Sequence, residues 1–93
     1  MAEQKRRSSP ILKVGRAAVA QLAELTGQKV EGLSGVHRDD DNGWVVNAEV
    51  LELRRIPETN DVLATYEVTL DDDGSLTGYR RVRRYTRSQT EEF

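Results

Sequence analysis

The stretch VLATYEVTLDDDGSLTGYRRVRRYT, residues 62–86, decides the fold of this chain. Apolar or aromatic residues occupy every second position from Val62 to Leu70, which is the period of a half-buried strand. Asp72-Asp73-Gly74 follows and supplies the positive-φ residues that a tight turn requires. A second strand is predicted over residues 76–86, so the stretch as a whole indicates an antiparallel hairpin.

Another strand is predicted upstream of this hairpin, beginning at Trp44. Apolar residues alternate with others from Trp44 to Val50, and the phase then changes because Leu51 and Leu53 fall on the other parity. Either a bulge or burial on both faces of the sheet explains such a change.

Short connections place these strands side by side. A weaker first strand is predicted over residues 30–38 and is joined to the next by the turn Asp41-Asn42-Gly43. The middle connection is longer; Pro57 ends the ladder there, and Asn60 tolerates a left-handed turn. Neighbouring strands with short connections are antiparallel, which predicts a four-stranded meander in the order 1-2-3-4.

A helix is predicted before the strands, over about residues 10–26. Ser9 can accept hydrogen bonds from the first free amides, Pro10 suits the first helical position, and Gly27 supplies a left-handed C-cap. The helix carries one apolar stripe at spacings of three and four, formed by Ile11, Val14, Ala18, Leu22 and Leu25. This stripe must cover the apolar face of the sheet, with Trp44 and Tyr66 in the core. The predicted fold is therefore α+β, with one N-terminal helix packed on a four-stranded antiparallel β-meander.

The length of 93 residues allows one domain. We expect a disordered basic tail at residues 1–8, a single α+β domain at 9–87 and a frayed tail at 88–93, because neither end can bury enough apolar surface. No apolar run approaches the roughly 20 residues of a membrane span. Lys13 and Arg16 interrupt the apolar segment that a secretory signal would need. The expected location is the cytoplasm, without membrane contact.

The residue inventory argues against an enzyme, a metal site and a cofactor. The chain has no cysteine, and His37 is its only histidine, so neither a thiolate nor a histidine-based site can be assembled. Two acidic clusters echo the start of a calcium loop, but the twelfth position counted from Asp39 is Val50 and from Asp71 is Val82. Neither valine can replace the bidentate glutamate of that loop, so both clusters are interpreted as hairpin turns. No catalytic residue is predicted.

The unusual feature is an arginine- and tyrosine-rich segment at residues 79–87. The side that its residues face depends on the preceding turn. If a three-residue turn with a G1 bulge pairs Asp71 with Ser75, Val82 faces the core opposite Ala64. We favour this register, in which the outer face carries Tyr79, Arg81, Arg83 and Tyr85. A two-residue turn would reverse the strand and point both tyrosines inward.

Two interpretations of this outer face carry similar weight. Its arginines can form ion pairs within the chain, with Glu49, Glu52 or Glu67 on neighbouring strands. Alternatively the face binds a partner, since arginine and tyrosine are enriched at interface hot spots and can also hold RNA. The segment lacks a known RNA-binding motif, so a protein partner comes first. The candidate partner-binding residues are Tyr79, Arg81, Arg83, Tyr85 and Arg87.

In this order and spacing, several segments resemble the core of the gas vesicle protein O family. The resemblance is carried by Gly43–Glu52, Arg55-Ile56-Pro57, Asp61–Val68, Asp73-Gly74, Tyr79-Arg80-Arg81 and Arg83–Arg87. It implies a non-enzymatic accessory or assembly factor, a minor component needed for gas vesicle formation and associated with the vesicle.

The partners implied by the resemblance are other gas vesicle proteins. The alternative that it leaves open is an RNA-binding regulator of gas vesicle gene expression or transcript stability, which would use nucleic acid as its partner. The outer strands of the predicted meander are sheet edges, so a homodimer formed by edge pairing also stays open.

Overall fold

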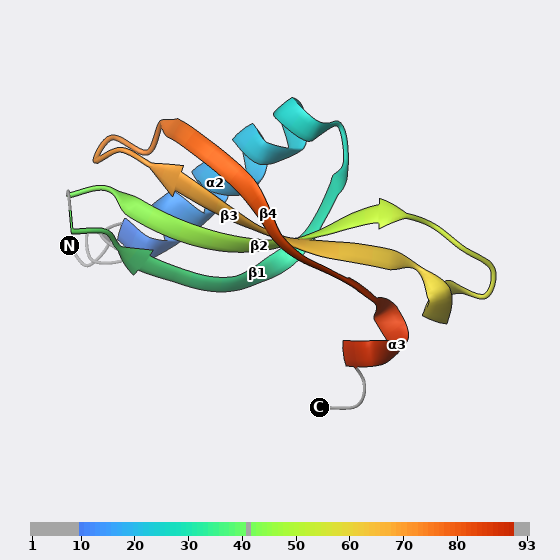
Figure 1. The fold of residues 1–93 in the computed structure, drawn as a ribbon. Coiled ribbons are helices and arrows are strands. Elements are labelled where there is room, and N and C mark those ends of the chain that lie inside the picture. Colours follow the sequence, from blue (N-terminus) through green and yellow to red (C-terminus); the bar gives the residue numbers. More distant parts are fainter. Residues whose placement is uncertain (1–9, 41, 91–93) are drawn as a thin grey trace, which may run out of the picture.

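Helix α2 (Pro10–Thr26) lies across one face of an antiparallel sheet whose four strands follow the order β1-β2-β3-β4 (Figure 1). The computed structural model describes residues 10–40 and 42–90. The strands are β1 (Lys29–Arg38), β2 (Trp44–Leu53), β3 (Val62–Leu70) and β4 (Leu76–Thr86), and two short helices are η1 (Glu58–Asn60) and α3 (Arg87–Thr90). The predicted α+β fold and its meander are confirmed.

Both predicted tails extend beyond the described part of the chain. The expected basic tail at residues 1–8 lies wholly outside it, and so do residues 91–93 of the expected C-terminal tail. Residues 87–90 form the single turn of α3. Among the described residues, no helix has both the length and the apolar character needed to span a membrane.

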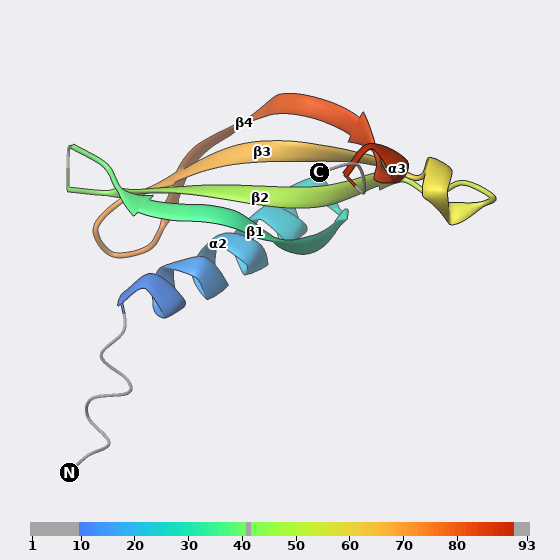
Figure 2. The same cartoon turned by 90° about the horizontal axis from the view of Figure 1, so that it is seen from below.

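Helix α2 ends as its sequence predicts. Gly27 has a φ of 69°, and its N–H donates to the Ala23 carbonyl at 2.8 Å, which caps the last turn. The predicted apolar stripe is only partly correct: Val14, Ala18 and Leu22 are buried, but Ile11 and Leu25 are 53% and 57% exposed. The helix crosses the strands obliquely (Figure 2), so only its middle turns lie over the sheet.

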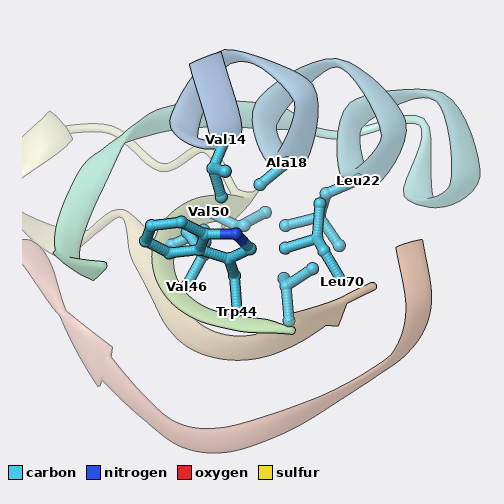
Figure 3. Close-up of a cluster of buried hydrophobic side chains, with 9 residues drawn as sticks. Val14, Ala18, Leu22, Trp44, Val46, Val50 and Leu70 are labelled. Atoms are coloured by element: carbon cyan, nitrogen blue, oxygen red, sulfur yellow. The ribbon is translucent and has the colours of Figure 1, made fainter. Parts of the chain in front are cut away.

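The main core fills the space between α2 and the sheet (Figure 3). Its buried members are Val14, Ala18, Leu22, Trp44, Val46, Ala48, Val50, Val68 and Leu70. Trp44 is in the core as predicted, whereas Tyr66 packs against the edge of this cluster and stays half-buried. Burying one such large aliphatic side chain contributes on the order of 1.5–3 kcal/mol, so this cluster is the principal source of stability.

The turns agree with the sequence at two of three places. Asp71 N–H donates to the Ser75 carbonyl at 2.9 Å and Gly74 has a φ of 87°, which is the predicted three-residue turn with its left-handed glycine. Asn42 has a φ of 69° in the first turn; Asp41 lies outside the described residues. Asn60 is not left-handed but belongs to η1, because one turn of 3-10 helix already reverses the chain there.

Bulges change the register between neighbouring strands along the sheet. Leu70 faces Leu76 as predicted, but Ala64 faces Arg84 rather than Val82, because the pairing shifts twice along β4. The pairing of β2 with β3 also shifts between Leu51 and Leu53, which confirms a bulge at the phase change. Burial on the second face occurs there too, since Leu51 packs with Leu63 and Tyr85 away from α2.

Candidate functional site

The arginine–tyrosine segment of β4 is divided between the two faces of the sheet. Tyr79 lies opposite Val68, a residue buried under α2, and Arg81 lies opposite Tyr66 on the same face. Tyr85 lies opposite Leu63, which faces away from the helix. The prediction of one shared outer face is therefore wrong: the pairing shift at Val82 inserts one residue, and one extra residue inverts the alternation.

On the face that carries α2, five residues form what we call the Glu52 cluster: Glu52, Tyr66, Tyr79, Arg81 and Arg84. Glu52 is the bulged residue of β2 and its side chain is 6% exposed. It accepts a hydrogen bond from the Tyr66 hydroxyl at 2.8 Å and binds the guanidinium of Arg81 at 3.0 Å. Arg84 Nε lies 3.1 Å from the same carboxylate. Burial, followed by the hydrogen bond to Glu52, raises the pKa of Tyr66 above its usual value.

The outer parts of this cluster remain accessible. The side chains of Arg81 and Arg84 are 45% and 55% exposed, and Tyr79 is 43% exposed while its ring lies 6.0 Å from that of Tyr66. Because one buried carboxylate holds two guanidinium groups, the cluster carries a net positive charge. Its chemistry suits contact with an acidic surface that also offers an apolar or aromatic group.

Glu49 organises the opposite face. Its Oε1 accepts hydrogen bonds from the hydroxyls of Tyr85 at 2.5 Å and Thr65 at 2.7 Å, and Oε2 accepts one from Ser34 at 2.7 Å. Arg83 lies over the Tyr85 ring at 4.3 Å. Burial and the hydrogen bond to Glu49 raise the pKa of Tyr85 to about 12. Burial acts to raise the pKa of Glu49, but its three hydrogen bonds outweigh this and lower it.

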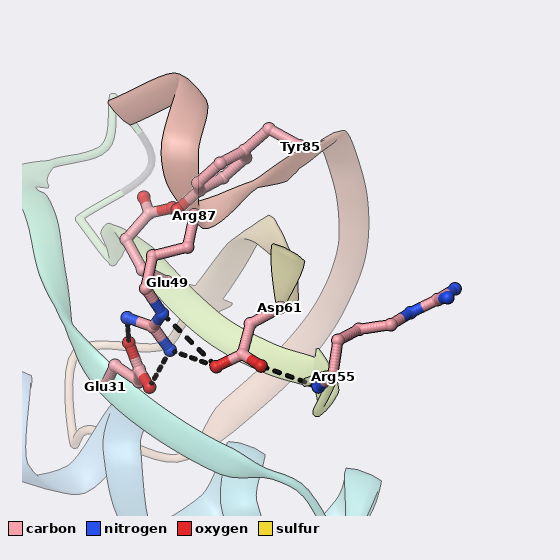
Figure 4. A network of polar contacts seen from close by, with 6 residues as sticks. All are labelled: Glu31, Glu49, Arg55, Asp61, Tyr85 and Arg87. Carbon is pink, nitrogen blue, oxygen red and sulfur yellow. Dashed lines mark hydrogen bonds and ion pairs between the residues drawn. The ribbon is translucent and has the colours of Figure 1, made fainter. Parts of the chain in front are cut away.

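Arg87 ties the end of β4 to β1 and to the loop before β3 (Figure 4). Its guanidinium binds Glu31 through two bonds of 3.0 and 2.9 Å and Asp61 Oδ2 at 3.0 Å. The Asp61 side chain is 4% exposed, and its other oxygen accepts the Arg55 N–H at 2.7 Å. The Arg87 N–H also donates to the Asp61 carbonyl at 2.8 Å. This bonding makes Arg87 part of the fold's internal structure.

These bonds shift the pKa of each charged group in the Arg87 network toward its ionised form. The pKa of Asp61 is lowered chiefly by the Arg55 N–H, against the effect of burial, and further by Arg87. The pKa of Glu31 is lowered chiefly by its hydrogen bonds from Arg87. The two carboxylates in turn raise the pKa of Arg87. All three groups are therefore more firmly ionised in the folded chain.

Ion pairs within the chain account for much of the arginine content. Arg80 binds Glu67 at 3.0 Å on the face away from α2, while the side chain of Arg80 stays 70% exposed. Glu52 and Glu67 pair with β4 arginines as one sequence interpretation expected, and Glu49 binds Tyr85 beside Arg83.

The sequence did not point to Arg84 as part of a cluster, nor to Glu31 and Asp61 as partners of Arg87. The sequence feature that could have indicated Arg84 is its position directly after Arg83, since neighbouring residues of a strand point to opposite faces.

The described residues offer no group of three or more histidine, cysteine, aspartate or glutamate side chains that could hold a metal ion. His37 is exposed on the edge strand β1.

Comparison with known proteins gives consistent results. The family model described as "Gas vesicle synthesis protein GvpO" matches residues 1–91. Gas vesicle protein O of Streptomyces sp. (strain CB03234) is 55% identical over 80 residues, which cover 86% of this chain and 62% of that protein. Gas vesicle protein O of Haloferax mediterranei is 36% identical over 69 residues, covering 74% of this chain and 49% of that protein. Gas vesicle protein O1 of Halobacterium salinarum is also 36% identical, over 74% of this chain and 57% of that protein.

This chain thus spans between about half and three-fifths of the length of the relatives that it matches. No solved structure shows significant similarity to it.

Proposed function

The chain belongs to the gas vesicle synthesis protein GvpO family, and from this premise we propose that it takes part in gas vesicle formation as a non-enzymatic accessory factor. It acts by contacts with other gas vesicle proteins, in association with the vesicle inside the cell. The family and its named relatives support the process, and the chemistry of the surface supports the mode of action.

The proposed mode of action, binding to other proteins, rests on the arrangement of side chains in the Glu52 cluster. Glu52 is covered, whereas Arg81 and Arg84, which it holds in place, keep about half of their side-chain surface exposed. Side chains already ordered in the free protein lose less conformational entropy on binding, so such arginines are well suited to an interface. Tyr79 adds an exposed aromatic ring beside them.

The docking face that we propose is therefore Tyr79, Arg81 and Arg84. It keeps two of the five residues that the sequence suggested and adds one. Arg83 lies on the opposite face of the sheet. Tyr85 and Arg87 are committed to internal hydrogen bonds, and we assign them to the stability of the fold.

The partner surface is expected to be acidic. Two guanidinium groups share one carboxylate in the Glu52 cluster, so a second carboxylate supplied by a partner would complete the pairing. An RNA partner is less well suited, because Arg80, Arg81, Arg84 and Arg87 all bind carboxylates of their own chain. One phosphate could complete the Arg81–Arg84 pairing as a carboxylate would, but further phosphates would have to displace Glu67 from Arg80 or Glu31 and Asp61 from Arg87.

The test compares two variants of one strand in vesicle-forming cells. The double variant Arg81→Gln with Arg84→Gln removes the charges of the docking face. Arg80→Gln is the matched control, since Arg80 is an exposed, ion-paired arginine of β4 on the other face. The tagged double variant is expected to lose the gas vesicle proteins that co-purify with the wild type, while Arg80→Gln retains them.

Mass spectrometry identifies the co-purified proteins, and circular dichroism checks that each variant is folded. Retention of the same gas vesicle proteins by the double variant would show that this face is not used. RNA binding that weakens steeply with salt, and that the double variant abolishes, would favour the regulatory alternative instead.

A further inference from the structure

A cleft lies between the loop that joins β2 to β3 and the end of β4 with the start of α3. It has a volume of about 370 Å³, near the lower end of the range for ligand pockets. We call it the Arg55 cleft, and its lining residues are Arg55, Val62, Arg84, Tyr85, Thr86 and Gln89. None of them is acidic, and three have side-chain N–H groups that can donate hydrogen bonds.

The two arginines of the cleft come from different elements, and both are accessible. Arg55 belongs to the loop, is exposed and forms no ion pair within residues 10–40 and 42–90. Arg84 belongs to β4; its Nε lies 3.1 Å from Glu52, and the side chain stays 55% exposed. The cleft thus combines one unpaired guanidinium with one that shares its carboxylate with Arg81. An acidic group of a partner would balance this excess of positive charge.

The other lining residues suit a carboxylate on a short apolar stem. Gln89 Oε1 accepts the Thr86 N–H at 2.8 Å, and Gln89 Nε2 donates to no other described residue, so it can donate to a ligand. Val62 is half-buried, and Tyr85 is buried with its hydroxyl bonded to Glu49, so both offer carbon surface to the cleft. The methylene groups of a glutamate can pack on that surface while its carboxylate meets the donors, whereas a phosphate has no such stem.

Asp61 joins the two sides of the cleft (Figure 4). On the loop side, Asp61 Oδ1 accepts the Arg55 N–H at 2.7 Å. At the end of β4, Asp61 Oδ2 accepts a hydrogen bond from the Arg87 guanidinium at 3.0 Å, and the Asp61 carbonyl accepts the Arg87 N–H at 2.8 Å. The Arg55 side chain points away from Asp61 and is available for contact. Asp61 is thus a positioning residue, which orders the walls of the cleft before a partner binds.

We propose that the Arg55 cleft receives a glutamate side chain of the partner gas vesicle protein, with its carboxylate bound by Arg55 and Arg84. This role of the cleft rests on the proposed function and deepens it, because Arg84 belongs both to the docking face and to the cleft. The partner then needs more than acidic charge in general. It presents a glutamate that can enter the cleft while the surface around it contacts Tyr79 and Arg81.

The test titrates the full chain with the peptide acetyl-Ala-Glu-Ala-amide and follows the side-chain N–H resonances of Arg55, Arg84 and Gln89 by NMR. The peptide with glutamine in place of glutamate is the matched probe without the charge. The glutamate peptide is expected to shift these resonances, and the glutamine peptide is not. Arg55→Gln is expected to weaken binding of the glutamate peptide about twofold to fivefold, the effect of losing one exposed ion pair.

Arg54→Gln is the control for net charge. Arg54 precedes Arg55, is also exposed and does not line the cleft, so its loss is expected to leave binding of the peptide unchanged. Equal shifts from the glutamine peptide, or full binding by Arg55→Gln, would overturn the proposal. Dimethyl phosphate carries the same single charge and resembles the RNA backbone. If it bound more tightly than the glutamate peptide, the cleft would be assigned to nucleic acid and the proposal would also be overturned.

Co-purification from vesicle-forming cells separates the role of the cleft from the proposed function. Arg55→Gln is expected to retain less of the gas vesicle proteins than Arg54→Gln does. If Arg55→Gln retains them at wild-type level while Arg81→Gln with Arg84→Gln loses them, the docking face stands and the cleft is not used. If the double variant also retains them, the docking face itself is refuted, and the role of the cleft is refuted with it because Arg84 is shared.

Discussion

The part of the sheet beneath α2 and the part beyond the end of the helix are held together by different forces. Under α2 the contacts are aliphatic: Leu22, Val46 and Val68 have no measurable exposure. Beyond the helix and on the opposite face of the sheet, three carboxylates, those of Glu49, Glu52 and Asp61, collect hydrogen bonds from tyrosine, threonine and arginine. Apolar contacts are non-directional, whereas bonds to charged groups depend on geometry and on pH.

This difference shows how a short chain extends its sheet past its core. The main apolar cluster covers the face of the sheet under α2, and outside it the small cluster of Leu51, Leu63 and Tyr85 is joined by charged networks. The same networks place arginine and tyrosine side chains at the surface in fixed positions, which is what a docking face requires. The two parts should therefore respond differently to mutation and to pH.

Loss of an aliphatic contact under α2 should have the largest effect. Leu22→Ala removes a fully buried side chain and is expected to lower the free energy of unfolding by about 2–5 kcal/mol. Leu25→Ala, at a position 57% exposed on the same helix, is the control and should change it by well under half as much. Urea denaturation measures both. Equal losses from the two variants would contradict the proposed position of the core.

Loss of the Arg87 network should have an intermediate effect. Arg87→Gln leaves the buried carboxylate of Asp61 with the Arg55 N–H but without its guanidinium. The melting temperature is expected to fall by about 4–8 °C, the shift that accompanies roughly 1 kcal/mol in a domain of this size. Arg80→Gln removes an ion pair whose arginine is 70% exposed and should lower the melting temperature far less. If Arg80→Gln were the more damaging variant, the internal role of Arg87 would be refuted.

The carboxylate networks should make the chain sensitive to acid. The folded pKa values of Glu31, Glu49 and Asp61 lie below their ordinary values of 4.5, 4.5 and 3.8. Their contribution to stability is fully present above about pH 4.5 and is lost as the pH falls through the lowered values. Arg87 is the main cause of the lowered pKa of Glu31 and a further cause of the lowered pKa of Asp61. Arg87→Gln should therefore make the free energy of unfolding depend less steeply on pH on the acid side. An unchanged slope would contradict this.

A smaller effect is expected on the alkaline side. The pKa of Tyr85 is raised from 10.0 to about 12, so its contribution is present below pH 10 and is lost as the pH rises toward 12. Ultraviolet titration should show one tyrosine that ionises near pH 12, and Tyr85→Phe should remove that step. Tyr85 ionising near pH 10 would disprove its hydrogen bond to Glu49.

The part beneath α2 could be predicted from the sequence because burial imposes a period on apolar residues. Val14, Ala18 and Leu22 recur at helical spacing, and Gly27, Asn42 and Gly74 mark left-handed positions. These signals are local, and each has one physical cause. The helix, the strand order and most of the core follow from them.

The part beyond the helix could not be predicted in the same way. Arginine and tyrosine are stable on either face of a sheet, so their alternation along β4 does not show which face each residue lies on. The pairing shift at Val82 does not change the pattern of apolar residues either, because Val82 is itself 42% exposed. Arg87 is separated from Asp61 by 26 positions in the sequence and from Glu31 by 56. A local sequence pattern cannot predict contacts between residues so far apart in the chain. The candidate residues were thus predicted on one face, whereas the strand places Tyr79 and Arg81 on the face of α2 and Arg83 and Tyr85 on the other.

The most direct test of the account is the number of gas vesicles per cell, counted by electron microscopy in cells whose only copy of this protein is a variant. Arg81→Gln with Arg84→Gln is expected to abolish most vesicles while the protein stays folded and present at wild-type level, and Arg80→Gln is expected to leave the number unchanged. Normal vesicle numbers with the double variant would contradict the claim that the Glu52 cluster is the functional face of this protein.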